Sequence, residues 1–458
     1  MTGTHPWFGV DGPPAGRSSS TAQVKQTLRH ELRDCGTRLQ SEVLALQPLV
    51  ATRTAYDELF SSARSLLRLL ERAVREAAPH RAGRLRALGA DEEPYPFFVA
   101  DEDFEIRYAA AMARPDVVIG PDGPKFLEFN VSGTFGGPAE IHLFTEAWTR
   151  LYGGPDAAPF EGYEPFAARA ALYSRVCSEL GLPPAVALLG SRLDRPDAES
   201  ARYYELEADC FRRHGLASEF LEPSDLMAEG EGELRYRLLH RYFAVDDWRD
   251  LGIGLEPVHN AVSRGALLFP PQSSYLIANK KTLAWISEGR PWMTEDDREL
   301  VARYLPWTRL VHPRKVEWRG MRHDLAALLL ENRRDFVLKK AIGMMGLQVV
   351  LGPYATDQEW EGAVTAALAD GDSIVQEYVE PGRYRMAMSR EAGPEPQYLD
   401  IAPVLSPVLF GEAAAGCWAR YHGTGEAGII GASGFGATEN VLLAARDRPL
   451  PGYRDAAE

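Results

Sequence analysis

The sequence predicts an α/β protein built from several lobes that fold as one unit. Apolar residues recur at helical spacing between residues 21 and 78, which predicts two or three amphipathic helices at the N-terminal end. Between residues 166 and 269, helical stretches alternate with short apolar runs such as Ala185–Leu189, a pattern typical of a parallel sheet. With 458 residues, the chain is long enough for two or three such lobes.

Composition narrows the classes of partner. The chain has 50 basic and 65 acidic residues and a formal net charge of -15, which disfavours nucleic acid and anionic membrane surfaces as main partners. We find no signal peptide and no apolar run long enough to span a bilayer. Cysteines are few and widely spaced, which favours the reducing cytoplasm: Cys35, Cys177, Cys210 and Cys417. The oligomeric state stays open, with a homodimer among the alternatives.

Residues 113–137 are the most informative stretch. Val117–Gly120 and Lys125–Phe129 are two short apolar runs separated by Pro-Asp-Gly-Pro, which predicts a β-hairpin. Folding about Asp122-Gly123 places Asp116 opposite residue 129 or 130, depending on whether the loop holds two or three residues. Because side chains alternate along a strand, residues 128 and 130 share one face and residues 127 and 129 share the other.

The hairpin carries an all-oxygen set of side chains at one end. Asp116, Glu128 and Asn130 are the types of ligand that suit Mg²⁺, a hard cation that retains waters and substrate phosphates. Arg114 lies two residues before Asp116 and can bind an anion through its guanidinium fork. The alternative is an ordinary amphipathic hairpin with a polar outer face.

A glycine-rich segment continues from the second strand. Its backbone amides and small side chains allow a phosphate or a substrate carboxylate to approach closely. The candidate substrate-binding residues are Ser132, Gly133, Thr134 and Gly136.

The hairpin and the glycine-rich segment form a series of three patterns, which are R-x-D at Arg114 and Asp116, E-x-N at Glu128 and Asn130, and then Gly-Gly. The series resembles the magnesium site of the circularly permuted ATP-grasp ligases. This group contains glutathionylspermidine synthetase and eukaryotic glutathione synthetase. The run from residue 128 to residue 137 is also similar to the corresponding segment of eukaryotic glutathione synthetase. The resemblance implies an ATP-grasp fold in permuted order, because the metal hairpin precedes the lid lysines.

The resemblance also implies a division of the chain. Residues 1–20, rich in Gly, Pro, Ser and Thr, are expected to form a disordered arm. Residues 21–160 hold the N-terminal helices and the metal-binding hairpin, and residues 161–275 an α/β substrate lobe. Residues 276–385 form the lid and the adenine hinge, and residues 386–458 return to the core.

Two pairs of lysines are candidates for phosphate binding. Lys280 and Lys281 begin an apolar helix, where the helix dipole disfavours cations unless an anion is bound. A pair of solvated lysines is the alternative, and the resemblance favours Lys280 as the nucleotide contact. On the next lid strand only one of Lys339 and Lys340 can face the cleft, and the resemblance favours Lys339. The loop Gly343-Met-Met-Gly346 contains fewer glycines than the corresponding loop of the family.

The last candidates lie in the C-terminal third. The strand from Ser373 ends in polar residues and a Pro-Gly turn, and its backbone can read an adenine edge. The nucleotide-binding candidates there are Gln376, Glu377, Tyr378 and Val379. Arg420 is a candidate second catalytic arginine beside Arg114, with an exposed strand arginine as the alternative.

The resemblance implies the use of ATP and Mg²⁺ to join a small acid to an amine through an acyl phosphate. Arg114 would stabilise charge on the transferring group and on the tetrahedral oxyanion. The expected substrates are an amino acid or small acid and an amino-acid or peptide amine, as in a peptide ligase of natural-product biosynthesis. The alternatives are an acid–polyamine ligase of the glutathionylspermidine type, an ATP-grasp phosphotransferase and a non-catalytic ATP-binding regulator.

Overall fold

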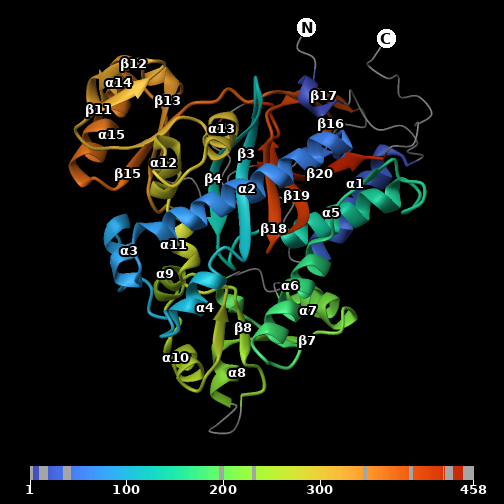
Figure 1. Cartoon of the computed structure of the whole chain (residues 1–458). Helices are drawn as coiled ribbons and strands as arrows, with labels where there is room; N and C mark the ends of the chain where they lie inside the picture. The colour runs from blue at the N-terminus through green and yellow to red at the C-terminus, as the bar shows by residue number, and fades with distance from the viewer. Residues whose placement is uncertain are drawn as a thin grey trace.

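The structure is a computed structural model with three connected parts, a central sheet, an α/β lobe below it in the view of Figure 1 and a smaller lobe beside it. It describes residues 4–9, 19–34, 43–194, 201–228, 234–343, 348–390, 396–426, 428 and 437–446. Among these residues, no helix combines the length and the apolar character that crossing a bilayer requires.

The central sheet joins strands that lie far apart in the sequence. Its order is β2 (Leu49–Ala51), β20 (Ala437–Ala445), β19 (Ala413–His422), β18 (Val404–Phe410), β3 (Met112–Gly120) and β4 (Gly123–Val131), with β5 (Phe160–Glu161) paired to β20. All neighbours are antiparallel except β2 and β20. The C-terminal strands therefore fix the position of the β3–β4 hairpin.

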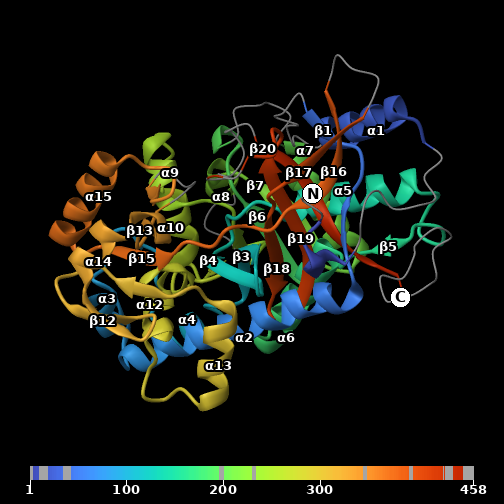
Figure 2. The ribbon, with the colours of Figure 1, turned by 90° about the horizontal axis from the view of Figure 1, so that it is seen from above.

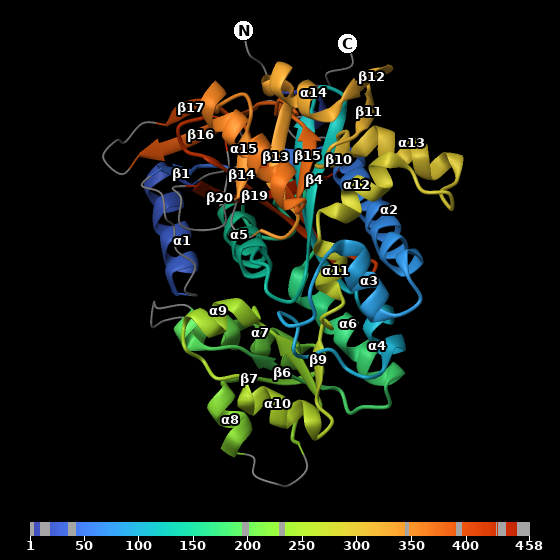
Figure 3. The ribbon, with the colours of Figure 1, turned by 90° about the vertical axis from the view of Figure 1, so that its left-hand side faces the viewer.

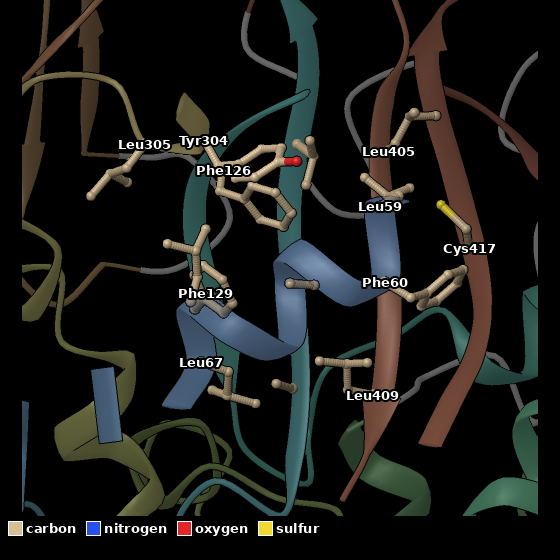
Figure 4. Close-up of a cluster of buried hydrophobic side chains, with 14 of the residues drawn as sticks. Leu59, Phe60, Leu67, Phe126, Phe129, Tyr304, Leu305, Leu405, Leu409 and Cys417 are labelled. Carbon is tan, nitrogen blue, oxygen red and sulfur yellow. The ribbon is translucent and has the colours of Figure 1, made fainter. Parts of the chain in front are cut away.

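Helices cover both faces of this sheet. Helix α2 (Arg53–Ala77) packs on one face, and α5 (Pro138–Leu151) and α6 (Pro165–Glu179) pack on the other. Thr52 caps the N-terminus of helix α2, because its hydroxyl accepts a hydrogen bond from Ala55 N. The apolar residues of the helix then recur at helical spacing. Figure 4 shows Leu59, Phe60 and Leu67 of this stripe facing side chains of β4, β18 and β19.

A three-stranded sheet and several helices complete this part of the molecule. Strand β16 (Tyr384–Arg390) lies between β1 (Val43–Ala45) and β17 (Gln397–Ile401), and all three are antiparallel. The remaining helices here are α1 (Thr21–Asp34), α3 (Arg81–Leu88), α4 (Glu102–Arg107) and α13 (Glu295–Tyr304).

The N-terminal arm differs from the disorder that its composition predicts. Residues 6–8 form a short 3-10 helix, and the Phe8 ring is fully buried, edge-on to Tyr384 at 5.0 Å. His5 N donates a hydrogen bond to Arg383 O at 2.8 Å. The aromatic pair explains why this segment is packed; residues 1–3 and 10–18 of the expected arm lie outside the described residues.

The lower lobe contains a fully parallel sheet, as the alternation of helices and apolar runs predicts. Its order is β7 (Ala217–Leu221), β6 (Ala185–Leu189), β8 (Leu238–Arg241) and β9 (Leu267–Phe269). It packs with α7 (Ala201–Arg213), α8 (Pro223–Ala228), α9 (Val245–Asp250) and α10 (Glu256–Ser263). Every residue of β8 is buried, as expected for an inner parallel strand.

The smaller lobe is an antiparallel sheet in the order β10 (Thr308–Leu310), β15 (Ser373–Glu377), β13 (Phe336–Lys340) and β14 (Val349–Leu351). Two helices, α14 (Leu325–Glu331) and α15 (Asp357–Asp370), pack on Phe336 and Leu338. The alternate residues Val337 and Lys339 therefore face the opposite way.

The connection to the smaller lobe runs through α11 (Ser274–Ala278) and α12 (Lys281–Glu288), and the lobe also carries the hairpin β11 (Lys315–Trp318) and β12 (Met321–Asp324). Figure 2 shows this lobe beside the end of the central sheet that holds β3 and β4.

Candidate active site

A cavity of about 420 Å³ lies where the three parts meet. Strands β3 and β4 line one side, β13, β14 and β15 another, and α9 and α11 a third. Figure 3 shows α9 and α11 below the small lobe, with β4 behind its strands. The volume is in the range of small-molecule sites.

The β3–β4 hairpin has a different register from the predicted one. Gly120 pairs with Gly123, so the turn lies at residues 121–122 rather than at Asp122-Gly123. A bulge after Asp116 then shifts the pairing by one residue, and Asp116 lies opposite Glu128 instead of residue 129 or 130. The neighbouring pair on this face joins Arg114 and Asn130.

The bulge also changes which side chains face the core. Phe126 and Phe129, three residues apart, both enter the core, with stacked rings 5.7 Å apart. Leu127, which simple alternation places on the core side, lines the cavity instead. Because the bulged strand holds two residues opposite one, four polar side chains share the cavity side: Arg114, Asp116, Glu128 and Asn130.

Asp116 is buried among cations and a hydroxyl. Its Oδ1 accepts hydrogen bonds from Arg420 Nη2 at 2.8 Å and from Ser406 Oγ at 2.7 Å, and Arg114 Nε lies 3.7 Å away. Burial alone would raise the pKa of Asp116, but Arg420, Arg114 and the Ser406 hydrogen bond outweigh it and hold the pKa at about 2. The carboxylate is therefore charged at neutral pH, and its Oδ2 has no hydrogen bond within the described part of the chain.

Hydrogen bonds to backbone carbonyl groups hold the side chains of Arg114 and Asn130. Arg114 Nη1 donates to Gly136 O at 3.0 Å, and its guanidinium lies 5.4 Å from the Trp418 ring centroid. Burial lowers the pKa of Arg114, and the charge of Asp116 opposes this effect. Asn130 Nδ2 donates to Arg114 O at 3.0 Å, which leaves the Asn130 Oδ1 as the amide acceptor toward the cavity.

Of the first lysine pair, only Lys280 lines the cavity. Its Nζ is 3.5 Å from Glu128 Oε2 and 3.4 Å from Gly343 O. Lys281 instead donates to Leu88 O and pairs with Asp372, both at 2.7 Å. The structure thus separates a cavity lysine from a structural one.

Lys339 is the second cavity lysine. Its Nζ donates to Gln376 Oε1 at 2.8 Å and to Leu127 O at 3.0 Å, and only 7% of the residue is exposed. Burial lowers the pKa of Lys339 to about 8, with Lys280 acting in the same direction and Glu128 opposing it. Lys340 lines the rim and pairs with Asp370.

The candidate adenine hinge lies at the end of β15. The N–H groups of Glu377 and Tyr378 already donate to Trp307 O and Asp335 O, at 2.8 and 2.7 Å. Two backbone groups stay without a partner among the described residues, the Glu377 carbonyl and the Val379 amide. Part of the predicted backbone edge is therefore used by the fold.

The side chains of this segment have structural contacts of their own. Gln376 holds Lys339 on one side and donates from Nε2 to Thr308 Oγ1 at 3.1 Å on the other. Glu377 pairs with Arg319 at 2.9 Å. The Gln376 side chain thus acts on the cavity through Lys339.

The glycine-rich segment divides into cavity residues and a packing residue. Ser132, Thr134 and Gly136 line the cavity, and Thr134 N donates to Ser132 Oγ at 3.0 Å. Gly133 does not line it; a methyl group there would collide with Arg241 O and the Pro270 ring. Gly133 therefore serves the close approach of the hairpin to the lower lobe, and its role as a substrate contact stays a prediction.

The predicted lid loop is described only at its ends. Gly343 and Gln348 line the cavity, and residues 344–347 lie outside the described residues.

Sequence reasoning missed Ser406 and the residues of the third side of the cavity. A single hydroxyl in the apolar run of β18 was the available signal for Ser406, which is fully buried against Asp116. The third side is formed by Pro94, Tyr95, Ala244, Val245, Asp246 and Tyr275. These residues come from three separated segments, and no motif links them.

No protein-family model matches the sequence, and no curated protein matches it. Among solved structures, the chain is similar to a glutathione synthetase-like effector from Globodera pallida, with a TM-score of 0.54, 13% identity, and coverage of 94% of this chain and 99% of that one.

The chain also matches a Methylobacillus flagellatus protein whose name is putative gamma-glutamylcysteine synthetase, at 15% identity and with coverage of 86% of this chain and 89% of that one. Its TM-score of 0.37 is too low to show a shared fold. The first likeness confirms the predicted ATP-grasp-type fold of the glutathione synthetase-like proteins, whereas the permuted order stays a prediction.

Proposed function

We propose that the protein is an ATP-dependent ligase that joins a carboxylic acid to an amine. The observation that carries this proposal is the meeting of Lys280 and Lys339 with Asp116, Glu128 and Asn130 around one cavity. Buried lysines opposite carboxylates suit a polyphosphate with its counter-ion. The likeness in fold to a glutathione synthetase-like protein supports the same reading.

The oxygen atoms around the cavity fit a magnesium ion. Within the described residues, no group of three or more His, Cys, Asp or Glu is arranged to hold a metal, so the Asn130 amide is needed as a third ligand. Asp116 offers Oδ2, Asn130 offers Oδ1, and Glu128 is partly exposed to the cavity. Mg²⁺ bound there would neutralise charge on the phosphates of ATP.

The remaining residues have separate roles. Lys280 and Lys339 bind phosphate oxygens, and the Glu377 carbonyl and Val379 amide contact the adenine edge. Arg114 stabilises negative charge that develops where the acyl group is transferred. Arg420, the second candidate catalytic arginine, acts as a positioning residue, because its guanidinium holds Oδ1 of Asp116.

The reaction proceeds in two balanced steps. The acid's carboxylate oxygen attacks the γ-phosphorus of ATP, the bond to the β-phosphate oxygen breaks, and ADP leaves. A neutral amine then attacks the acyl carbonyl, the bond to the phosphate oxygen breaks, and the amine proton departs with the phosphate. Water must be excluded in between, because it would hydrolyse the acyl phosphate.

The test is ADP release from Mg²⁺-ATP with pooled amino acids, small acids, peptides and amines, followed by mass spectrometry. A ligase releases ADP only when an acid and an amine are both present, and forms a product equal to their sum less water. ADP release with a single acceptor and a phosphorylated product would identify a phosphotransferase instead. ATP binding without ADP release from any pair would contradict the proposal.

A further inference from the structure

The third side of the cavity differs in chemistry from the other two. We call Pro94, Tyr95, Ala244, Val245, Asp246 and Tyr275 the lower wall. Tyr95, Ala244 and Val245 are at least nine-tenths buried, and the Tyr95 and Tyr275 rings lie 5.7 Å apart. The lower wall is therefore aromatic and apolar, with Asp246 as its charged group.

Every described cation that lines the cavity already has a partner outside the lower wall. The pairs are Arg114 with Gly136 O, Arg420 with Asp116, Lys280 with Glu128, Lys339 with Gln376 and Lys340 with Asp370. All five cations lie on the central sheet, on β13 or at the start of α12. They adjoin the proposed nucleotide and metal positions, away from the lower wall.

Two other cations near the lower wall do not line the cavity. Arg241 is fully buried behind Tyr275, donates to its hydroxyl at 2.5 Å, and also contacts Phe243 O. Arg249 bridges Glu93 at 2.9 Å and Asp246 at 3.4 Å. The described cations thus leave the lower wall without one that a substrate carboxylate can reach.

Two stretches outside the described residues contain no cation in their sequence. Gly343 and Gln348, which flank residues 344–347, line the cavity, and so does Gly428. The sequence of residues 344–347 is Met-Met-Gly-Leu, and residues 427–436 contain no Lys or Arg.

We propose that the lower wall receives the amine substrate, and that this substrate is an aromatic or apolar primary amine without an α-carboxylate. This inference rests on the proposed ligase function. The ammonium form is attracted to Asp246, and the apolar tail packs on Tyr95 and Tyr275. In an amino acid, the α-carboxylate is bonded to the same carbon as the nitrogen, so it would lie close to Asp246 and be repelled by it. Among the described residues, the cation paired with Asp246 is Arg249, which also bridges Glu93 and does not line the cavity.

The inference narrows the amino-acid or peptide amine expected from sequence. It also disfavours a polyamine, because a second ammonium would enter an apolar wall that offers one carboxylate. Before attack the bound ammonium releases one proton to water, and the neutral amine then reacts as described above.

Matched pairs of probes test this directly by binding, without turnover. Tryptamine and tryptophan, and tyramine and tyrosine, differ only in the carboxylate; spermidine serves as the polyamine probe. Titration calorimetry of the full chain saturated with Mg²⁺-ADP is expected to show each amine binding at least tenfold more tightly than its amino acid and than spermidine. Equal or tighter binding of the amino acids or of spermidine, or no binding of the amines at millimolar concentration, would overturn the inference.

Variants locate the effect. Asp246→Asn should weaken tryptamine binding about three- to tenfold, because an exposed ion pair contributes modestly, and leave Mg²⁺-ATP binding unchanged. Asp246→Lys should reverse the preference toward tryptophan. Asp247→Asn is the matched control, since Asp247 follows in the same helix but does not line the cavity.

An unchanged tryptamine affinity in Asp246→Asn, or an equal loss in Asp247→Asn, would contradict the role of Asp246. Failure of the ligase proposal gives a different result, because ADP release would then be absent with every acid and amine pair. Amide formation with amino acids only would retain the ligase and overturn the inference.

Discussion

Replacing Lys339 by Met is expected to stabilise the protein at neutral pH and to impair ATP binding. Lys339 is buried, and a pKa reduced from 10.5 to about 8 corresponds to about 3 kcal/mol of unfavourable free energy for the charged form. Loss of the hydrogen bonds to Gln376 and Leu127 O costs about 1 kcal/mol each. The variant should therefore gain about 1 kcal/mol in free energy of unfolding at pH 7.

The stabilising effect of Lys339→Met should reverse at higher pH. Because the folded-state pKa of Lys339 lies below the unfolded value, the unfolded chain binds more protons between about pH 8 and 10.5, and wild-type stability rises over this window. The unfavourable free energy of the charged Lys339 is present in full below pH 8, and about 2 kcal/mol of it is removed by about pH 9.5. At that pH the variant should be less stable than the wild type by about 1 kcal/mol.

Urea unfolding at pH 7 and pH 9.5 measures both effects, and calorimetry measures Mg²⁺-ATP binding, which should weaken by about tenfold to a hundredfold. Lys340→Met is the matched control, because that lysine lies at the cavity rim with a third of its side chain exposed. A Lys339→Met variant that is equally destabilised at both pH values, or that binds Mg²⁺-ATP as the wild type does, would refute the reasoning.

Three further predictions concern single contacts. Lys280→Ala should weaken ATP binding at least tenfold with little change in melting temperature, whereas Lys281→Ala should lower the melting temperature and spare ATP binding; the reverse pattern would exchange their roles. Gly133→Ala should reduce the free energy of unfolding by about 2 kcal/mol or more in urea titrations through overpacking. Gly136→Ala should not, because a methyl group there would meet the Trp418 ring at an ordinary van der Waals distance of 3.9 Å; equal losses would contradict the packing role. Arg420→Met should cost about 3–5 kcal/mol in the same assay by leaving Asp116 buried without its closest cation, and a loss under about 1 kcal/mol would count against that pairing.

Turn residues and the spacing of apolar residues in short segments predicted the hairpin and the parallel lobe. The ATP-grasp-type fold was predicted from the resemblance of the hairpin residues to a known family. The register of the hairpin could not be predicted, because the bulge at Leu127 follows from packing of Phe126 and Phe129 against α2. A turn pattern alone does not show a shift of one residue. The buried Phe8 is a similar case, since its partner Tyr384 is far away in the sequence.

The candidate site divides in the same way. Lys280, Lys339 and the hairpin residues lie in local motifs, and the structure gathers them around one cavity. The packing role of Gly133 could not be predicted, because a glycine-rich run does not reveal which glycine is packed against another lobe. Ser406 and the lower wall reach the cavity only through long-range contacts, which no spacing in the sequence records.

The central claim is tested most directly by following oxygen atoms from the acid. The protein is incubated with Mg²⁺-ATP, amines, and a pool of acids whose carboxylates carry oxygen-18, and the phosphate and the amide product are analysed by mass spectrometry. A ligase that uses an acyl phosphate transfers one labelled oxygen into the phosphate for each amide and ADP formed, and Glu128→Gln should reduce this at least tenfold. Release of AMP and pyrophosphate, or unlabelled phosphate beside the amide, would contradict it.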